Sequence, residues 1–168
     1  MGRSRGGLTS KLHLLCEGRC RPLSLTLSAG QVHDSDEATI GAVLDGVRVP
    51  RPSGKGRPRK RPGRVLGDKG YSYKKCRRLL RQRGIACLIP ERKDQREQRK
   101  KKGRAGGRPC HFDKEQYKRR NMVERTFLRL KQQRRVATRY DKLGESYQAW
   151  ATLASIRLWL RSEPSNTL

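Results

Sequence analysis

The chain has 168 residues, which suits one ordinary domain, and its 42 Lys and Arg against 15 Asp and Glu give a formal net charge of +27. Residues 51–139 carry 33 basic and seven acidic side chains, so nearly the whole excess lies in one segment. Such a concentration of positive charge repels itself unless a polyanion neutralises it, which makes nucleic acid the first partner to consider.

The same composition excludes several classes of protein. The longest apolar segment, residues 149–160, is too short to span a membrane and contains Arg157, so no membrane partner is expected. No continuous apolar segment follows the basic N-terminus, which argues against a secretory signal. The five cysteines are odd in number and scattered, which is typical of a reducing compartment, and we expect a cytoplasmic protein. His13, Cys16 and Cys20 lack the paired Cys-x2-Cys spacing of a zinc site.

The first forty residues predict a β-hairpin and a short helix. Residues 11–16 and 22–28 are apolar runs, and Glu17-Gly-Arg19 between them is suited to a tight turn. Asp34 or Ser35 is expected to cap a helix that runs through residues 38–44.

Residues 51–64 are of a different composition, with seven basic residues, three prolines and no acid. No core can form from them, so we expect an exposed, extended loop. The Gly-Arg-Pro triplet at 56–58 is similar to arms that enter the DNA minor groove, and a solvated linker with non-specific phosphate affinity is the alternative. The candidate DNA-binding residues of this loop are Arg57, Arg59, Lys60 and Arg61.

A strand, a helix and a second strand are predicted next, over residues 64–67, 71–83 and 85–89, with Gly84 ending the helix. This order favours a parallel strand pair and therefore an α/β sheet. We expect the hairpin to lie beside these strands in one mixed sheet. Residues 91–109, with nine Lys or Arg and three glycines, are expected to form a second basic loop.

One long helix is predicted from Asp113, its cap, to Lys131. Its apolar stripe comprises Val123, Phe127 and Leu130. Beside that stripe Tyr117, Glu124 and Lys131 recur every seven residues, which keeps them on one face of a continuous helix. Arg120 lies one turn before Glu124. A last helix is predicted over residues 147–160. It carries an aromatic-rich stripe that we expect in the core, formed by Trp150, Leu153, Ile156, Leu158 and Trp159.

Two acids are candidates for chemistry. Asp68 follows a strand and precedes a helix, the place where sites form in open α/β sheets, and Glu124 stands alone between Arg120 and Arg125. A helix cap for Asp68 and an ion-paired surface role for Glu124 are the alternatives. Since hard divalent cations require carboxylate oxygens, two acids in this basic segment also suit a metal site among phosphate-binding cations.

The chain resembles the DDE transposases of bacterial insertion sequences. The pattern Tyr117-x2-Arg120-x3-Glu124-x6-Lys131 is similar to the Tyr-Arg-Glu-Lys signature of that family. Six further stretches, in order along residues 2–142, resemble the same family: Gly2-Arg-Ser-Arg-Gly-Gly-Leu-Thr9, Gly30-Gln-x2-Asp34-Ser35, Asp68-Lys-Gly-Tyr71, Ile89-Pro90-Glu91, Gly106-Gly-Arg-Pro109 and Ala137-Thr-Arg-Tyr-Asp-Lys142. The resemblance extends to about residue 161.

The resemblance implies a ribonuclease-H-like fold, a mixed sheet with flanking helices, and Mg²⁺-dependent cleavage and strand transfer of transposon ends. It implies that Asp68 and Glu124 are the second and third of three acids that bind two metal ions, with Mn²⁺ as a substitute. It also implies that Tyr117, Arg120 and Lys131 contact DNA near the scissile phosphate. Transposon ends, target DNA and other transposase copies are the implied partners, at the nucleoid.

One departure from the family pattern concerns the first strand and its aspartate. Residues 1–33 contain a single acid, Glu17, at the expected hairpin turn, and Asp34, Asp36 and Asp45 come too late in the topology. We therefore expect residues 1–161 to form a partial catalytic domain that lacks its first strand, with residues 162–168 as a tail. An upstream segment would complete the enzyme, and three origins fit its absence: a second reading frame joined by frameshifting, a misplaced start, or decay of the element.

Two other classes compete with an incomplete transposase. A non-catalytic DNA-binding fragment that represses transposition would have the same charge and signature. A basic ribosomal or chromatin-like packing protein would explain the charge but not the spaced signature.

Overall fold

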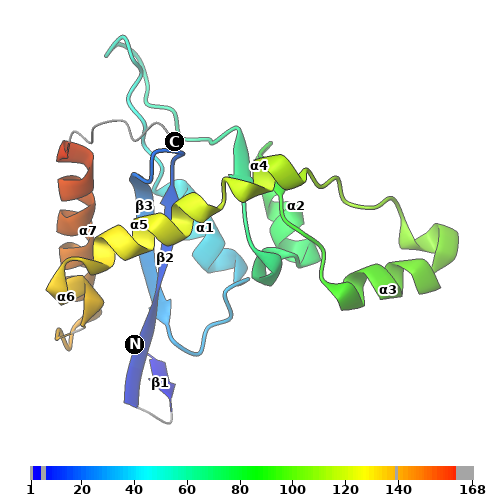
Figure 1. Ribbon diagram of the computed structural model, residues 1–168, viewed down its shortest axis with the longest axis horizontal. Coiled ribbons are helices and arrows are strands. Elements are labelled where there is room, and N and C mark those ends of the chain that lie inside the picture. The colour runs from blue at the N-terminus through cyan, green and yellow to red at the C-terminus, as the bar shows by residue number, and fades with distance from the viewer. Residues whose placement is uncertain (1, 5–6, 139, 162–168) are drawn as a thin grey trace. The chain divides into compact units, whose positions relative to one another are not determined.

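The computed structural model describes residues 2–4, 7–138 and 140–161, which form two compact units (Figure 1). The first unit comprises Met1–Val32, Ala42–Lys60 and Asn121–Leu168, and the second comprises His33–Gly41 and Arg61–Arg120. No helix in the described part of the chain is long and apolar enough to cross a membrane.

The predicted hairpin forms the sheet of the first unit. Strands β2 (Gly7–Cys16) and β3 (Pro22–Ala29) pair antiparallel from Ser10↔Ala29 to Cys16↔Pro22, with a register shift between Leu15 and Cys16. A short strand β1 (Gly2–Ser4) pairs with the start of β2, so the order is β1-β2-β3. The alternating leucines of β3 place one face of this sheet against helices.

Three helices cover that sheet: α5 (Asn121–Lys131), α6 (Arg134–Ala137) and α7 (Gly144–Leu160). Helix α5 packs on β2 and α7 on β3, and α6 lies between the two helices along the chain (Figure 1). Leu130, Val136 and Ala154 form a buried cluster, against which Leu14 and Leu158 pack. Each of the three helices thus contributes one buried residue to this cluster.

The prediction that the aromatic-rich stripe of the last helix is core is wrong for three of its members. Leu153, Ile156 and Trp159 are exposed, and the buried face of α7 consists of Ala151, Ala154 and Ser155. Small side chains let the helix axis approach the sheet closely, so the larger side chains on the other faces remain outside.

In the second unit the predicted strand, helix and strand are confirmed as β4 (Arg64–Leu66), α2 (Lys74–Gln82) and β5 (Ala86–Leu88). β4 and β5 are parallel, in the register Val65↔Cys87. Cys76 and Leu80 on α2 are buried, as are Leu88 and Ile89. Gly84 follows α2 with a φ of 63°, a left-handed conformation that glycine adopts without strain.

The prediction of one mixed sheet is wrong, because the hairpin and the parallel pair belong to two separate sheets. Alternation of apolar and polar residues predicts which face of a strand is buried. It does not predict which strand lies beside which, because neighbouring strands pair through backbone N–H and C=O groups.

The prediction of a loop over residues 91–109 is also wrong, since residues 93–101 form helix α3 (Lys93–Lys101), followed by the 3₁₀ helix η2 (Gly103–Gly106). Lys, Arg, Gln and Glu are good helix formers, and residues 91–101 contain no proline or glycine. A basic composition therefore does not by itself predict a loop. By contrast, residues 51–63 form an exposed loop as predicted, in which only Pro62 is half-buried. The loop is not extended throughout, because the Gly54 N–H bonds to the Arg51 carbonyl in a turn, and Val49 and Arg59 form a bridge.

Two local predictions need correction. Helix α1 (Glu37–Asp45) is capped by Asp36, whose Oδ2 accepts the backbone N–H of Thr39 at 2.9 Å, and not by Asp34 or Ser35. The single helix predicted over 113–131 is two helices, α4 (Lys114–Lys118) and α5. Asp113 does cap α4 as predicted. The N–H groups of Arg119 and Arg120 bond to carbonyls three residues back, which tightens the last turn and ends α4.

Candidate functional site

Asp68 lies directly after β4, where it caps the 3₁₀ helix η1 (Lys69–Tyr71). Its Oδ1 accepts the backbone N–H of Gly70 at 2.8 Å, and a Cβ at position 70 would lie only 2.9 Å from that oxygen. A side chain at Gly70 would therefore displace the carboxylate. The cap interpretation of Asp68 is confirmed, and the carboxylate remains exposed at the end of its strand.

Tyr71, at the end of η1, is the residue on which several charged groups of the second unit act together. Burial, with the carboxylates of Asp68 and Asp34, raises the pKa of Tyr71 to about 12, and the guanidinium of Arg120 partly opposes that rise. The hydroxyl is therefore protonated at neutral pH. Two predicted site residues, Asp68 and Arg120, thus share one electrostatic neighbourhood with Tyr71, and Asp34 belongs to it as well.

Asp34 is a residue whose effect on Tyr71 the sequence analysis did not predict. The turn that carries it is held at α2: the Cys76 thiol donates to the Ser35 carbonyl at 3.5 Å, and the His33 ring packs edge-on against Tyr73 at 5.3 Å. The Ser35 backbone N–H also donates to Nδ1 of His33 at 3.1 Å. The signal that could have found Asp34 was its motif, Gly30-Gln-x2-Asp34-Ser35, which stands among the family-like stretches.

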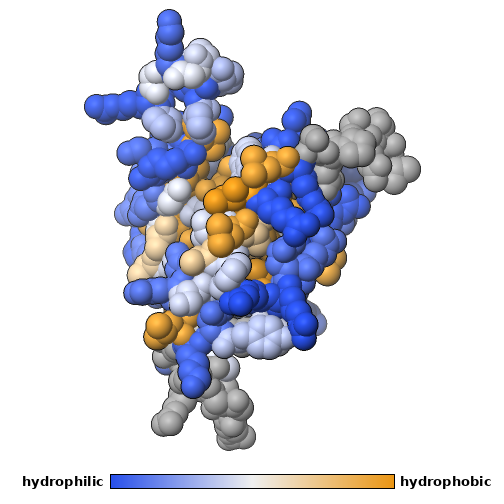
Figure 2. All heavy atoms as spheres, turned by 90° about the vertical axis from the view of Figure 1, so that its left-hand side faces the viewer, coloured by the Kyte–Doolittle hydropathy of each residue, from blue (hydrophilic) through white to orange (hydrophobic). Residues whose placement is uncertain are grey.

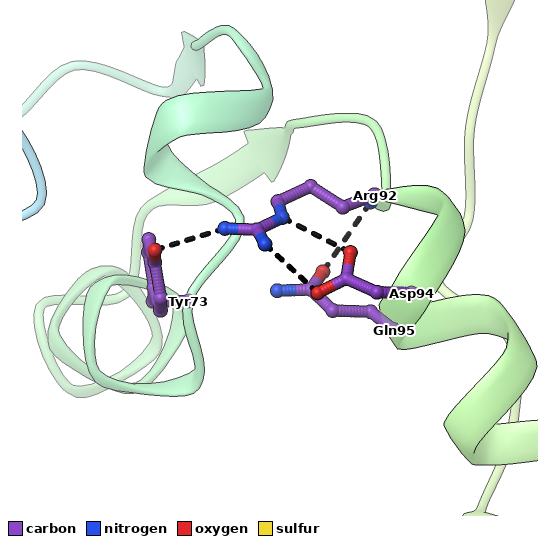
Figure 3. A network of polar contacts seen from close by, with 4 residues as sticks. All are labelled: Tyr73, Arg92, Asp94 and Gln95. Carbon is purple, nitrogen blue, oxygen red and sulfur yellow. Dashed lines mark hydrogen bonds and ion pairs between the residues drawn. The ribbon is translucent and has the colours of Figure 1, made fainter.

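Arg92 joins the start of α3 to the residue that precedes α2 (Figure 3). Its guanidinium donates to the Tyr73 hydroxyl at 2.9 Å and forms two hydrogen bonds with Asp94, at 3.0 and 2.8 Å. A hydrogen bond from Arg92 lowers the pKa of Asp94, so this acid is ionised and paired. The side chain of Gln95 accepts the Arg92 N–H at 3.4 Å. This network positions α3. Because both carboxylate oxygens of Asp94 bond to Arg92, we interpret Asp94 as a structural residue.

Tyr117 and Arg120 lie on α4 and in the turn after it, in the second unit. The Tyr117 ring contacts Phe112 at 5.0 Å, and Gln116 of α4 accepts a hydrogen bond from Arg64 of β4. Helix α4 is thereby held beside β4, the strand that precedes Asp68. Because the helix ends before Arg120, the four signature residues do not share one continuous helical face, contrary to the prediction.

Glu124 and Lys131 lie on α5 in the first unit, both exposed and seven residues apart. Glu124 acts on Cys16 at the end of β2. Burial raises the pKa of that thiol, a hydrogen bond with Thr126 lowers it, and the charges of Cys20, Glu17 and Glu124 raise it. The structure therefore places Glu124 near the end of the long hairpin strand.

The four candidate residues of the basic loop, Arg57, Arg59, Lys60 and Arg61, are all exposed. The backbone of Arg59 pairs with Val49 through hydrogen bonds of 3.0 and 2.8 Å, and the Arg51 Nε donates to the Arg57 carbonyl at 3.2 Å. The loop is thus tied at its base, with its cations facing solvent.

A complete metal site is not formed by the residues described. Over 2–4, 7–138 and 140–161, no three His, Cys, Asp or Glu side chains come together as a candidate metal site. His13 instead bonds with Ser28, its Nε2 lying 2.7 Å from the serine Oγ. Asp68 and Glu124 each offer an exposed carboxylate, which is the donor type that Mg²⁺ prefers.

Comparison with known proteins gives two matches. The family model of the transposase DDE domain matches residues 2–159. A Burkholderia cepacia protein described as a transposase for insertion sequence element IS402 is 30% identical over 151 residues. That alignment covers 90% of this chain and 62% of the relative, so the chain spans less than two thirds of the relative's length. No solved structure gives a significant match.

Proposed function

Since the chain belongs to the transposase DDE domain family of insertion sequences, we propose that it carries the second and third catalytic acids of such an enzyme and acts in the cleavage and strand transfer of element ends. The observation that carries this proposal is the neighbourhood of Tyr71. There Asp68, which follows a parallel strand, and Arg120, of the family signature, act on the hydroxyl group of the half-buried Tyr71.

Asp68 and Glu124 are the residues we propose as Mg²⁺ ligands, and Mn²⁺ would suit the same donors. The bond from Gly70 engages Oδ1 of Asp68 and fixes the orientation of its carboxylate. When bound, two metal ions supply activation of the attacking oxygen and stabilisation of the leaving oxygen at phosphorus.

The cationic residues have distinct roles in this proposal. Arg120 presents a planar fork that matches two phosphate oxygens, and Lys131 presents a point charge. Tyr117 contacts the DNA near the scissile phosphate. The loop cations, Arg57, Arg59, Lys60 and Arg61, bind phosphates without reading sequence, which positions the duplex.

We propose that the chain is inactive alone, because a first aspartate is lacking. Residues 1–33 contain one acid, Glu17, in the turn between β2 and β3. In addition, β4 and β5 form a sheet of only two strands with three residues each, which is marginal without further strands. A strand from an upstream polypeptide would add to this small sheet and would carry the missing aspartate. The enzyme would act as an oligomer in the bacterial cytoplasm, at the nucleoid.

The test is Mg²⁺-dependent cleavage of end-sequence DNA by residues 1–168 and by a chain fused to the upstream segment. We expect no cleavage by the first and cleavage by the second. In the fused chain, Asp68→Asn and Glu124→Gln should abolish cleavage while DNA binding persists, since removing a negative charge does not weaken phosphate affinity. Specific nicking by the unfused chain would contradict the proposed incompleteness.

The second candidate function is repression by a non-catalytic DNA-binding fragment. The lack of a three-residue metal group in the described chain, together with its exposed cations, favours this candidate. It predicts occupation of element ends without nicking, in both the unfused and the fused chain. The cleavage assay therefore separates the two functions.

A further inference from the structure

The outer face of α7 carries apolar side chains that no described residue covers. Leu153, Ile156 and Leu160 are 54%, 48% and 79% exposed, and their spacing of three and four residues places them on one side of the helix. The opposite side is buried in the first unit. Figure 2 faces the side on which α7 lies in Figure 1, and hydrophobic atoms gather there in a band bordered by hydrophilic ones.

Two tryptophans flank this band. Trp159 is 43% exposed, although its Nε1–H donates to the Pro22 carbonyl at 2.7 Å and the Arg21 guanidinium lies 5.0 Å from its ring centre. Trp150, nine residues earlier and thus on the other flank, lies 4.3 Å from the guanidinium of Arg135. The hydrogen bond and the stacked guanidinium hold the Trp159 ring in one orientation while part of it stays accessible.

The charges around the band are mostly positive, although Arg21 is paired with Glu17 at 3.9 Å. Arg21 and Arg135 cover the two rings, Arg157 and Arg161 lie on α7 or directly after it, and the acid of α7 is in its first turn, at Glu145. A protein partner of this face would need acidic residues at its rim. A nucleic acid strand supplies phosphates for the arginines and flat apolar bases for the rings.

We propose that the outer face of α7 binds a single-stranded DNA segment, with unpaired bases stacked on Trp159 and lying along Leu153 and Ile156, and with phosphates on the surrounding arginines. This surface belongs to the first unit and is formed by a helix that carries neither Asp68 nor any of the candidate residues of the basic loop. The inference rests on the proposed role in DNA transposition only for the choice of DNA as the nucleic acid that is bound. It adds a strand-binding site to that role.

The experiment uses the full chain and a 12-nucleotide oligo(dT), with a 12-base-pair duplex as the second probe. In the Trp150→Phe variant Trp159 is the remaining tryptophan, and oligo(dT) should quench its fluorescence. Trp159→Ala should weaken oligo(dT) binding about 5- to 100-fold and leave duplex binding unchanged. The matched control is Tyr140→Ala, which removes an exposed aromatic side chain outside α7 and should change the affinity for neither probe.

Arg161→Glu is a second variant, at an exposed position that should leave folding unaffected. It should weaken oligo(dT) binding more than duplex binding. The proposal is overturned if neither Trp159→Ala nor Arg161→Glu weakens oligo(dT) binding. It is also overturned if these variants weaken the binding of oligo(dT) and of the duplex equally. Loss of self-association in Leu153→Asp, with oligo(dT) affinity intact, would assign the face to a protein partner instead. Failure of end cleavage in the fused chain would contradict the proposed function and leave these binding results standing.

Discussion

Tyr71 lies where the carboxylates of Asp34 and Asp68 and the guanidinium of Arg120 act on one hydroxyl group. Asp68 already serves the fold as the cap of η1. A proposed metal ligand that also caps a helix has its carboxylate orientation fixed before any ion binds, which reduces the ordering cost of binding. The glycine at position 70 is part of that arrangement, because a side chain there would contact Oδ1.

Tyr71 should make stability depend on pH in the alkaline range. Its pKa in the folded chain is about 12, against 10 for an ordinary tyrosine, so between these values the folded state holds a proton that the unfolded state has lost. The contribution is therefore complete below pH 10 and is lost as pH rises through 12. Urea unfolding from pH 9.5 to 12 should show a steeper fall for the native chain than for Tyr71→Phe. Equal slopes would mean that the phenol is solvated.

The carboxylates near Tyr71 can be tested separately. Asp34→Asn and Asp68→Asn should each lower the pKa of Tyr71, because each removes a negative charge that opposes the phenolate. The absorbance of tyrosinate, taken as the difference from the matching Tyr71→Phe chain, reports this pKa. Asp36→Asn is the matched control, since Asp36 is engaged at the start of α1. An unchanged titration in Asp34→Asn would remove Asp34 from this neighbourhood.

At the scale of elements, α5 combines a buried face with an exposed one. Leu130 is fully buried, whereas Phe127 is only half-buried. The exposed face carries Glu124 and Lys131, whose side chains are available to DNA and metal in the proposed function. One helix therefore serves the core and the proposed site through different positions.

Substitutions in and before α5 should separate these roles. Leu130→Ala should lower the free energy of unfolding by about 2–5 kcal/mol, because it leaves a cavity in the core of the first unit. Lys131→Ala and Arg120→Ala should leave thermal unfolding nearly unchanged and reduce strand transfer by the fused chain. If Arg120→Ala lowers the melting temperature as much as Leu130→Ala does, Arg120 is a structural residue.

The basic loop of residues 51–64 should act as a unit on DNA of any sequence. Replacing Arg57, Lys60 and Arg61 by Gln removes three exposed cations and leaves the backbone bridge between Arg59 and Val49 in place. If each cation meets one phosphate, the slope of log K against log salt should become less steep by about three. Binding to element ends and to unrelated duplexes should weaken alike. A loss confined to element ends would show that this loop reads sequence.

At the scale of the whole molecule, the distribution of charge governs binding. Residues 51–139 hold nearly all of the +27 excess, and they span parts of both units. A chain of this kind binds any duplex through counterion release, so its specificity depends on other contacts.

The native chain should therefore bind duplex DNA with a strong salt dependence. Contact with about five to eight phosphates predicts a slope of log K against log salt of about −5 to −7. Fluorescence anisotropy of a labelled duplex between 50 and 300 mM salt measures it. A slope shallower than about −2 would indicate that most of the cations do not reach the DNA.

The sequence by itself determined the features that depend on neighbouring residues. The hairpin, the parallel strands, the exposed loop at 51–64 and the caps at Asp68 and Asp113 all follow from periodicity, composition and local hydrogen bonding, which act over a few residues. The family followed from motifs in fixed order, and the family model matches nearly the same span, residues 2–159.

Only the tertiary structure decided which distant segments meet. The division into two sheets, the approach of Asp34 to Tyr71 and the exposure of the outer face of α7 depend on backbone edges and on close packing across many residues of chain. Residues 34 and 71 are far apart in sequence, and no local pattern of residues predicts that the charge of Asp34 acts on Tyr71. The end of α4 before Arg120 is decided by the hydrogen bonds of its last turn, which the seven-residue repeat of side chains does not specify.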